Sequence, residues 1–221
     1  HRKYPNPPAI YTSSIQRAID TGDIIAGGLT PIQKITSLFD KSPLNIDKQY
    51  AGKIIYVSPG GGKTYLFDRY SNLIDTDEML RVRMVQEGIG PREGETVGQA
   101  ISRVFDTSRD LMESIYSEVA SQMKDIAATG LTVLTGSNRF IPIADHVILT
   151  KDDQRLEANL KGGNITASQF RAREQSRLRE PGKPNRTVMY MDPTQTLEDV
   201  LTKKKPEDKP SFEPIAELNS A

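Results

Sequence analysis

The sequence contains no cysteine and no tryptophan, and only two of its 221 residues are histidines, His1 and His146. Without cysteine the chain can form no disulfide, thiolate nucleophile or cysteine-ligated metal site, which fits an intracellular protein. Two histidines also leave little for a Ser/His catalytic triad or a histidine-rich metal centre. These absences argue against most enzyme classes that depend on thiols or imidazoles.

A charge excess of either sign is also missing, as are long apolar runs. Lys+Arg and Asp+Glu both number 29, so the balance gives no global attraction to nucleic acid or to anionic membranes. No apolar run approaches membrane-spanning length, and residues 1–11 lack the apolar core of a signal peptide. We expect a cytoplasmic or otherwise intracellular protein with no membrane partner, and association with a virion stays open.

The two ends of the chain differ in composition from its middle. Residues 1–50 hold two helical patterns, "SSIQRAIDTG" and "TPIQKITSLFD", which predict a helical N-terminal extension. Residues 203–221 are rich in proline and charge, which predicts a disordered, flexible tail, and contact of its lysines with nucleic acid or an acidic partner stays open. The start at His1 suggests a remnant or a fragment of a longer protein.

Residues 51–202 alternate apolar strands with helical patterns. The predicted strands lie in "GKIIYVS", "NLID", "GLTVLTGS", "DHVILT" and "TVMYMD", and a long helical pattern with a break inside covers residues 96–128. Such alternation predicts parallel βαβ units with right-handed crossovers. We therefore expect one α/β domain with a five-stranded parallel sheet.

The stretch "IIYVSPGGGKTYL" has the elements of a phosphate-binding loop. After an apolar strand come Gly60, Gly61 and Gly62, whose backbone can approach a phosphate, then Lys63 for the β/γ-phosphates and Thr64 for Mg²⁺. The spacing departs from G-x-x-x-x-G-K-[ST], because the first glycine of that motif falls on Val57. The alternative is an ordinary glycine turn between a strand and a helix.

A pair of carboxylates follows the second predicted strand, in "LIDTDEML". Asp75 and Asp77 stand at the carboxyl end of that strand, where open α/β sheets bind ligands. Two carboxylates at this spacing can hold a hydrated Mg²⁺ and orient an acceptor hydroxyl. The alternative is N-capping of the next helix, and both roles can coexist.

The order of these motifs resembles the P-loop small-molecule kinases, the nucleoside-monophosphate kinase and shikimate kinase group. The resemblance spans residues 53–201 and implies a three-layer P-loop fold with a mobile lid after the fourth strand. It implies that Asp75 serves Mg²⁺ with Thr64, and that Asp77 contacts the acceptor. Arg81 and Arg83 lie where this family often contacts an anionic acceptor, and a solvated helix face is their alternative.

The resemblance also implies a lid and a base-recognition loop. The lid is residues 160–186, where glycines bracket four arginines, of which Arg171 and Arg173 are the first choice for stabilising the moving phosphoryl group. The alternative is a solvated, charged helix whose arginines pair with Glu174 and Glu180. In "DPTQT", backbone near Pro193 and Thr194 is expected to contact adenine.

Three functions remain open at this point. The first is ATP- or GTP- and Mg²⁺-dependent phosphoryl transfer to a nucleotide or other small acceptor. The second is a nucleotide-binding or NTP-hydrolysing module of a larger assembly, such as a viral structural or replication protein. The third is an interaction domain in which the glycines form only a turn. Under the first two, the nucleotide-binding residues are Ser58, Pro59, Gly60, Gly61, Gly62, Lys63, Thr64, Tyr65 and Pro193, with Lys63, Asp77, Arg171 and Arg173 as catalytic residues.

Overall fold

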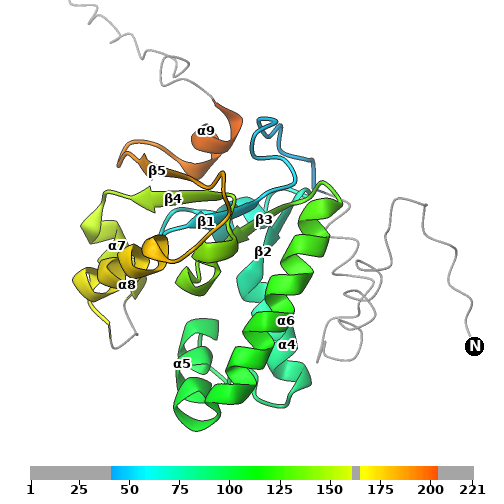
Figure 1. Ribbon diagram of the computed structural model, residues 1–221, viewed down its shortest axis with the longest axis vertical. Helices are drawn as coiled ribbons and strands as arrows, with labels where there is room; N and C mark the ends of the chain where they lie inside the picture. Colours follow the sequence, from blue (N-terminus) through cyan, green and yellow to red (C-terminus); the bar gives the residue numbers. More distant parts are fainter. Residues whose placement is uncertain (1–40, 161–164, 204–221) are drawn as a thin grey trace, which may run out of the picture.

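A five-stranded parallel sheet forms the centre of the protein (Figure 1). The computed structural model describes residues 41–160 and 165–203, so the two helical patterns before residue 41 and the predicted tail beyond residue 203 lie outside the described residues. The strand order is β2-β3-β1-β4-β5, with every neighbouring pair parallel. The strands are β1 (Ile54–Val57), β2 (Leu73–Asp75), β3 (Thr132–Thr135), β4 (His146–Thr150) and β5 (Thr187–Met191).

The helices alternate with these strands, as the sequence predicts. The helix expected after the glycines is short, because it ends at Phe67 rather than continuing toward Asn72. The break expected within residues 96–128 falls at Ser108. The helices are α3 (Lys63–Phe67), α4 (Thr76–Gln86), α5 (Val97–Thr107), α6 (Arg109–Ala128), the 3-10 helix η1 (Asn138–Ile143), α7 (Asp153–Leu160), α8 (Ala167–Arg179) and α9 (Leu197–Thr202).

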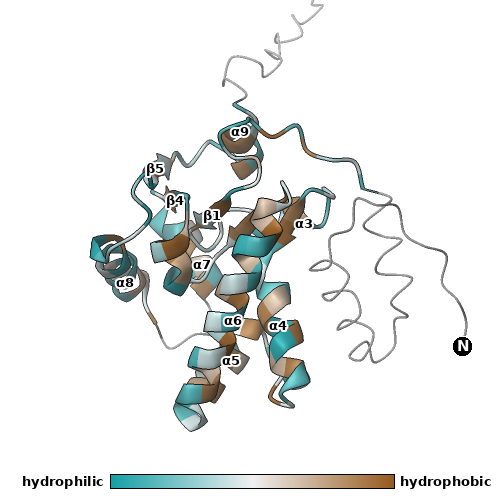
Figure 2. Ribbon diagram, turned by 45° about the vertical axis from the view of Figure 1, so that its right-hand side comes forward, coloured by the Kyte–Doolittle hydropathy of each residue, from teal (hydrophilic) through white to brown (hydrophobic). Residues whose placement is uncertain are grey.

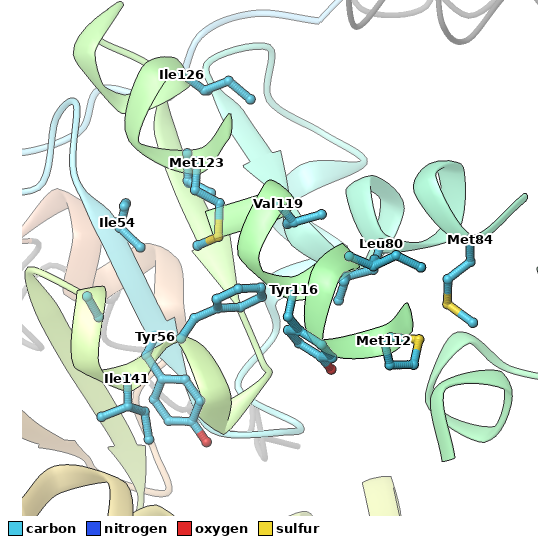
Figure 3. Packing of buried hydrophobic residues seen from close by; sticks show 14 of the residues in the cluster. Ile54, Tyr56, Leu80, Met84, Met112, Tyr116, Val119, Met123, Ile126 and Ile141 are labelled. Atoms are coloured by element: carbon cyan, nitrogen blue, oxygen red, sulfur yellow. The ribbon is translucent and has the colours of Figure 1, made fainter. Parts of the chain in front are cut away.

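The central strand β1 is buried on both faces, and its residues alternate between two hydrophobic clusters. Ile54 and Tyr56 belong to the larger cluster, which buries apolar residues of α4, α5, α6 and η1 (Figure 3). Ile55 and Val57 belong to the other, which includes residues of α3, α9 and the segment 44–50. Figure 2 shows α9 above the strands and α4, α5 and α6 below them. The sheet therefore lies between two layers, which makes the fold a three-layer α/β arrangement.

The chain leaves two neighbouring strands toward opposite faces of the sheet. After β1 it continues into α3, whose Leu66 packs in the second cluster, and after β3 into η1, whose Phe140 packs in the first. In open α/β sheets, ligands bind in the crevice at the carboxyl ends of strands at such a switch point. The loop after β1 and the residues that follow β3 are thus where a site is expected.

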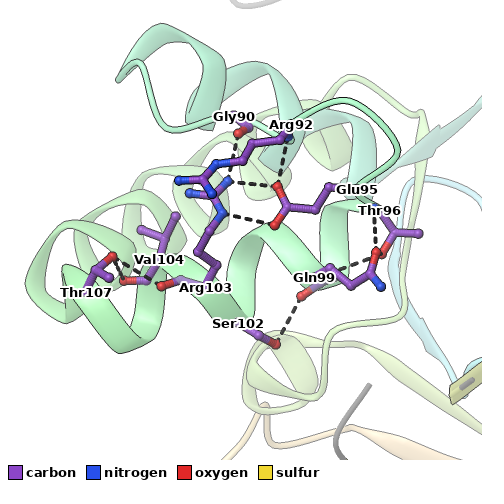
Figure 4. Close-up of polar contacts among 10 residues, drawn as sticks. Gly90, Arg92, Glu95, Thr96, Gln99, Ser102, Arg103, Val104 and Thr107 are labelled. Atoms are coloured by element: carbon purple, nitrogen blue, oxygen red, sulfur yellow. Dashed lines mark hydrogen bonds and ion pairs between the residues drawn. The ribbon is translucent and has the colours of Figure 1, made fainter. Parts of the chain in front are cut away.

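The connection between α4 and α5 is fixed by polar contacts (Figure 4). The Arg103 guanidinium donates to both carboxylate oxygens of Glu95, at 3.0 and 2.9 Å, and to the Gly90 carbonyl at 3.0 Å. The hydrogen bonds from Arg103 and from the Arg92 backbone lower the pKa of Glu95 to about 2. A capping box of Thr96 and Gln99 begins α5 directly afterwards.

His146 has a structural position at the start of β4. Its Nδ1 lies 2.6 Å from the Thr187 hydroxyl and its Nε2 lies 2.9 Å from the Gln49 carbonyl oxygen. Its ring also meets Tyr50 edge-on at 4.9 Å. These contacts attach residues 49–50 to the sheet. None of the described helices is long and apolar enough to cross a membrane.

Candidate functional site

The loop after β1 makes a tight turn that only glycine fits well. Gly60 and Gly62 have φ angles of 79° and 93°, in the left-handed region that favours glycine. Gly61 has no room for a side chain, because a Cβ on it would lie 2.3 Å from Val57 Cγ1 and 3.0 Å from the Ser58 carbonyl oxygen. Among the described residues, nothing accepts a hydrogen bond from the backbone N–H of Gly62 or Lys63. These donors are therefore open to an anion.

Lys63 leads from this loop to the two predicted carboxylates. Its Nζ lies 2.6 and 2.8 Å from the two carboxylate oxygens of Asp75 and 2.7 Å from Asp77 Oδ2. The Lys63 and Asp75 side chains are 11% and 5% exposed, whereas that of Asp77 is 48% exposed. The structure thus brings together three site residues that the sequence analysis proposed, from the ends of two different strands.

The charges of this cluster oppose one another. Burial lowers the pKa of Lys63, but the Asp77 and Asp75 carboxylates outweigh burial and leave the pKa above its usual value. Burial and the charge of Asp77 raise the pKa of Asp75, against the lowering effect of Lys63. Lys63 is therefore held as an ammonium ion. With two carboxylates around one ammonium, the cluster carries a net charge of −1 when both are ionised.

Asp75 also caps α4. It is the N-cap residue, and its Oδ1 accepts from the backbone N–H of Asp77 at 2.9 Å. The capping interpretation of Asp75 is therefore confirmed. The same carboxylate contacts Lys63, so a structural role and a role in the cluster coexist in one side chain.

The end of β3 forms one wall around Lys63. A Cβ on Gly136 would lie 3.2 Å from Lys63 Cε, so glycine leaves room for the lysine side chain to pass. Thr135, one residue earlier, hydrogen-bonds the Thr76 hydroxyl at 2.9 Å. Gly136, the glycine that follows the third strand, thus has a steric reason at this site.

The donors fit a hydrated Mg²⁺ by their chemistry. The described residues hold no cluster of three or more His, Cys, Asp or Glu side chains that could bind a metal. Mg²⁺ commonly uses one or two carboxylates with waters and substrate phosphates, and Asp75 and Asp77 provide two. The Lys63 ammonium lies between them, which shows that the geometry accommodates a cation.

The expected lid arginines lie apart from the Lys63 cluster. Arg171 pairs with Asp153 and donates to the Thr150 carbonyl at 2.9 Å. Arg173 is exposed and forms no ion pair within residues 41–160 and 165–203. Among the described residues, neither contacts Lys63, Asp75 or Asp77.

The alternative to a lid was a solvated helix whose arginines pair with Glu174 and Glu180. This alternative is correct for Glu180 and wrong for Glu174. Glu180 pairs with Arg177 at 2.7 Å on the surface, as a solvated helix would have it. Glu174 is only 1% exposed and accepts hydrogen bonds from the hydroxyls of Tyr56 and Ser58, at 2.5 and 2.7 Å. A buried carboxylate thus fastens α8 to β1 and to the first loop residue. Sequence reasoning missed this role because spacing alone does not separate the buried position from the exposed ones around it.

The remaining proposed site residues lie on the surface. Arg81 pairs with Glu78, and Arg83 pairs with Glu87 and Glu118, so α4 presents both arginines in ion pairs. Thr64 and Tyr65 are exposed at the start of α3, and the guanidinium of Arg69 lies 4.7 Å from the Tyr65 ring centre.

Pro193 and Thr194 lie in an exposed turn between β5 and α9. The turn leads to Leu197, whose Cβ is 4.0 Å from the position of a Cβ on Gly62. The contact between this region and the glycine loop is thus made by Leu197, the first residue of α9, and not by Pro193.

A pocket of about 270 Å³ lies beside η1 and was not expected from the sequence. Arg139 stands over the rings of Phe105 and Tyr116, at 4.2 and 5.1 Å, and pairs with Glu113 at 2.7 Å. The Ser137 hydroxyl donates to the Tyr116 hydroxyl at 3.3 Å. The one feature of the sequence that could have pointed to this pocket is Arg139 in "LTGSNR", three residues after Gly136. The lining includes Glu113, Tyr116, Ser117, Arg139, Phe140 and Arg177.

The comparisons with known proteins add no relative. No family model matches the chain, and neither a curated protein nor a solved structure matches it. The geometry described above is therefore the basis for a functional proposal.

Proposed function

We propose that this protein binds a nucleoside triphosphate together with Mg²⁺ at residues 58–64 and transfers the terminal phosphoryl group to a small acceptor. The observation that carries this proposal is the position of Lys63. Its ammonium stands at the end of a glycine loop with open N–H donors and within 2.8 Å of Asp75 and Asp77. An ordinary glycine turn has no need of a largely buried lysine between two carboxylates, which costs desolvation energy.

Each residue of the cluster has a role in the proposal. The backbone N–H groups of Gly60, Gly62 and Lys63 bind the phosphate oxygens, and the Lys63 ammonium neutralises them. Thr64 and Asp75 hold Mg²⁺, which when bound offsets negative charge on the phosphates. The proposal includes both ATP and GTP, because the loop N–H groups, Lys63, Thr64 and Asp75 act on the phosphates and Mg²⁺ and do not contact the base.

Nucleotide binding requires Lys63 to exchange partners. In the described conformation its ammonium is shared by two carboxylates, so a phosphate must replace at least one of them. The net charge of −1 on the ionised cluster repels a bare triphosphate and attracts a divalent cation. We therefore expect the nucleotide to bind as its Mg²⁺ complex and weakly without the metal.

The pocket beside η1 is the proposed acceptor site. It is lined by Arg139 and Phe140 of η1, the helix that begins two residues after Gly136, against which Lys63 lies. Arg139 is paired with Glu113 and Arg177 with Glu180, so an anionic acceptor must replace these carboxylates before the two arginines can bind it. With the aromatic surface of Tyr116 and Phe140, the exchange suits a planar, anionic acceptor such as a nucleoside monophosphate. Burial raises the pKa of Tyr116, and the charge of Asp77 adds a smaller effect in the same direction.

The transfer itself is an in-line displacement at the terminal phosphorus. The bond from phosphorus to the β,γ-bridging oxygen breaks, and a new bond forms to an oxygen of the acceptor. The nucleoside diphosphate leaves with the electron pair. Where the acceptor oxygen belongs to a hydroxyl, Asp77 is the group that orients it and takes its proton.

A second candidate is a nucleotide-binding or NTP-hydrolysing module that transfers nothing to an acceptor. One observation favours it: Arg171 is held by Asp153 and the Thr150 carbonyl, and Arg173 is exposed, so neither expected lid arginine is at the Lys63 cluster. Without an arginine at the moving phosphoryl group, Lys63 and Mg²⁺ alone offset its developing charge, so transfer is slower even where binding is intact.

An assay with a panel of acceptors separates the two candidates. Mg²⁺ and ATP or GTP are incubated with the protein, with and without nucleoside monophosphates and small alcohols, and products are resolved by chromatography. The proposal predicts diphosphate formed in step with a phosphorylated acceptor, and loss of transfer to hydroxyl acceptors in Asp77→Asn. Phosphate release that no acceptor changes would instead support the hydrolysing module, and no turnover with intact binding would support a module that only binds.

A further inference from the structure

A second pocket, of about 310 Å³, lies between α8 and the ends of β4 and β5, at the same edge of the sheet as the glycine loop. No part of the proposed function uses it. Its walls come from the carboxyl ends of two neighbouring strands, from α8 and from the first residue of α7. The residues that matter to its chemistry are Thr150, Lys151, Asp153, Arg171, Glu174 and Tyr190.

Glu174 presents one free oxygen to this pocket. Its Oε1 accepts both hydrogen bonds, from Tyr56 and from Ser58. Among the described residues no donor reaches Oε2. Every fully buried side-chain nitrogen or oxygen atom in this part of the chain has a hydrogen-bond partner, so Oε2, which has none, must be partly accessible. Since Glu174 is 1% exposed and lines the pocket, the small accessible part of this side chain faces it. A buried carboxylate oxygen without a donor favours a ligand that brings one.

The positive charges around the pocket already have partners. Arg171 pairs with Asp153 and donates to the Thr150 carbonyl, and Lys151 pairs with Asp192 at 3.1 Å. Glu174, in contrast, has only hydroxyl partners. The pocket therefore favours a hydrogen-bond donor next to Glu174 rather than an anion.

Tyr190 adds an aromatic surface to the same pocket. It stands on β5 with 49% of its surface exposed, and it is one of three large hydrophobic side chains that are exposed among the described residues. Exposed aromatic rings at a pocket stack on planar rings of ligands. A planar ring that carries an N–H donor thus matches both Tyr190 and Glu174.

Ser58 connects this pocket to the phosphate loop. It is the first residue after β1, it is 2% exposed, and its hydroxyl donates to the carboxylate that lines the pocket. We propose that this pocket takes the base of the bound nucleotide, with an exocyclic amino group of the base donating to Glu174 and the ring stacked on Tyr190. The inference rests on the proposed function, and it names amino-bearing purines as the bases that bind.

The proposal is tested by calorimetric titration of the whole chain with ligands that differ in one group. Mg²⁺ complexes of tripolyphosphate, ATP, purine riboside triphosphate, GTP and inosine triphosphate are the probes. Within the pairs ATP and purine riboside triphosphate, and GTP and inosine triphosphate, only an exocyclic amino group differs. A hydrogen bond to a charged group predicts a preference of about 10- to 100-fold for the amino-bearing member of at least one pair.

Two substitutions assign that preference to residues. In Glu174→Gln the amide oxygen remains with the two hydroxyls, which need an acceptor, so its NH₂ group faces the pocket and the preference for the amino group is lost. Tyr190→Ala weakens all four nucleotides by about tenfold but leaves tripolyphosphate unchanged, because stacking on an aromatic ring is lost. Tyr190→Phe keeps the ring and the affinity. Val188→Ala is the matched control, since Val188 is also exposed on β5, at 46%, but does not line the pocket.

The outcomes separate this inference from the proposed function. Tripolyphosphate binding that Lys63→Ala removes, with equal affinity for both members of each pair and no effect of Tyr190→Ala, would overturn the base site and leave the phosphate site standing. Absence of binding by every probe would overturn both. Should Glu174→Gln fail to fold, as judged by circular dichroism, Tyr190→Ala against Val188→Ala still decides, because both residues are exposed.

Discussion

Replacement of Lys63 by methionine tests whether the lysine and the two carboxylates form a buried cluster. Methionine keeps much of the side-chain volume but removes the charge, so Asp75 remains 5% exposed without its cation. Removing one partner of a buried ion pair typically costs about 3 to 5 kcal/mol of unfolding free energy. Asp77, which is 48% exposed, adds little to this cost because water screens it.

Protonation of Asp75 limits the cost and makes it depend on pH. A carboxyl with an ordinary pKa near 3.9 can be protonated at pH 7 for about 4 kcal/mol, and at pH 5 for about 1.5 kcal/mol. Burial and Asp77 raise the pKa of Asp75 even with Lys63 present, and the substitution raises it further. A raised pKa in the folded state means that stability is complete below the unfolded-state pKa and is lost as pH rises through the folded-state pKa. The penalty is thus about 3 to 4 kcal/mol at pH 7 and about 1.5 kcal/mol or less at pH 5.

Urea unfolding at both pH values measures this penalty for the whole chain. Lys203→Met is the matched control, because Lys203 pairs with Asp47 at 2.9 Å but is 57% exposed. That substitution is expected to cost less than about 1 kcal/mol at either pH. A Lys63→Met penalty no larger than that of the control, or one that does not shrink at pH 5, would refute the buried cluster.

Four further predictions follow from the same structure. Gly136→Ala places a Cβ 3.2 Å from Lys63 Cε and is expected to weaken Mg²⁺-ATP binding in calorimetry several-fold, whereas Gly98→Ala, with open space around its Cβ, leaves binding unchanged. Gly62→Ala strains a residue at φ 93° and is expected to destabilise the protein by about 1 to 2 kcal/mol in urea unfolding, more than Gly98→Ala, which should stabilise α5 slightly. NMR titration is expected to give a pKa of about 2 for Glu95 and a higher pKa in Arg103→Met, still below the ordinary value because the Arg92 backbone hydrogen bond remains, so the contribution of the pair persists above pH 4 and disappears as pH falls through 2. Tyr56→Phe removes one hydrogen bond to the buried Glu174 carboxylate and is expected to cost about 1.5 to 3 kcal/mol in urea unfolding, with an unchanged value contradicting the contact.

The strands and most helices could be predicted from local patterns. "IIYV" is apolar at each position because β1 is buried on both faces, and the five strands and the break near Ser108 follow from the same reasoning. The glycine loop could be predicted from its glycines, lysine and threonine after an apolar strand, and Asp75 from its place at the carboxyl end of a parallel strand. The length of α3 was not predictable, since its end depends on packing of Leu66 against α9 rather than on helix propensity.

The contacts across the sheet could not be read from spacing. Glu174 lies 116 residues from Ser58, and nothing in "FRAREQSRLRE" distinguishes it from the exposed charges beside it. The ring stack of Phe105 and Tyr116 under Arg139 likewise depends on how α5, α6 and η1 pack. Local patterns predict which residues form helices, whereas burial of a particular polar side chain is decided by tertiary packing.

Calorimetric titration of Mg²⁺-ATP and Mg²⁺-GTP into the wild-type protein and Lys63→Met, each checked for folding by circular dichroism, tests the central claim most directly. The account predicts saturable binding to the wild type and a loss of affinity of at least tenfold in the variant, with Lys203→Met unchanged. Absence of binding to the folded wild type, or equal affinity in Lys63→Met, would contradict the claim that this loop holds phosphate.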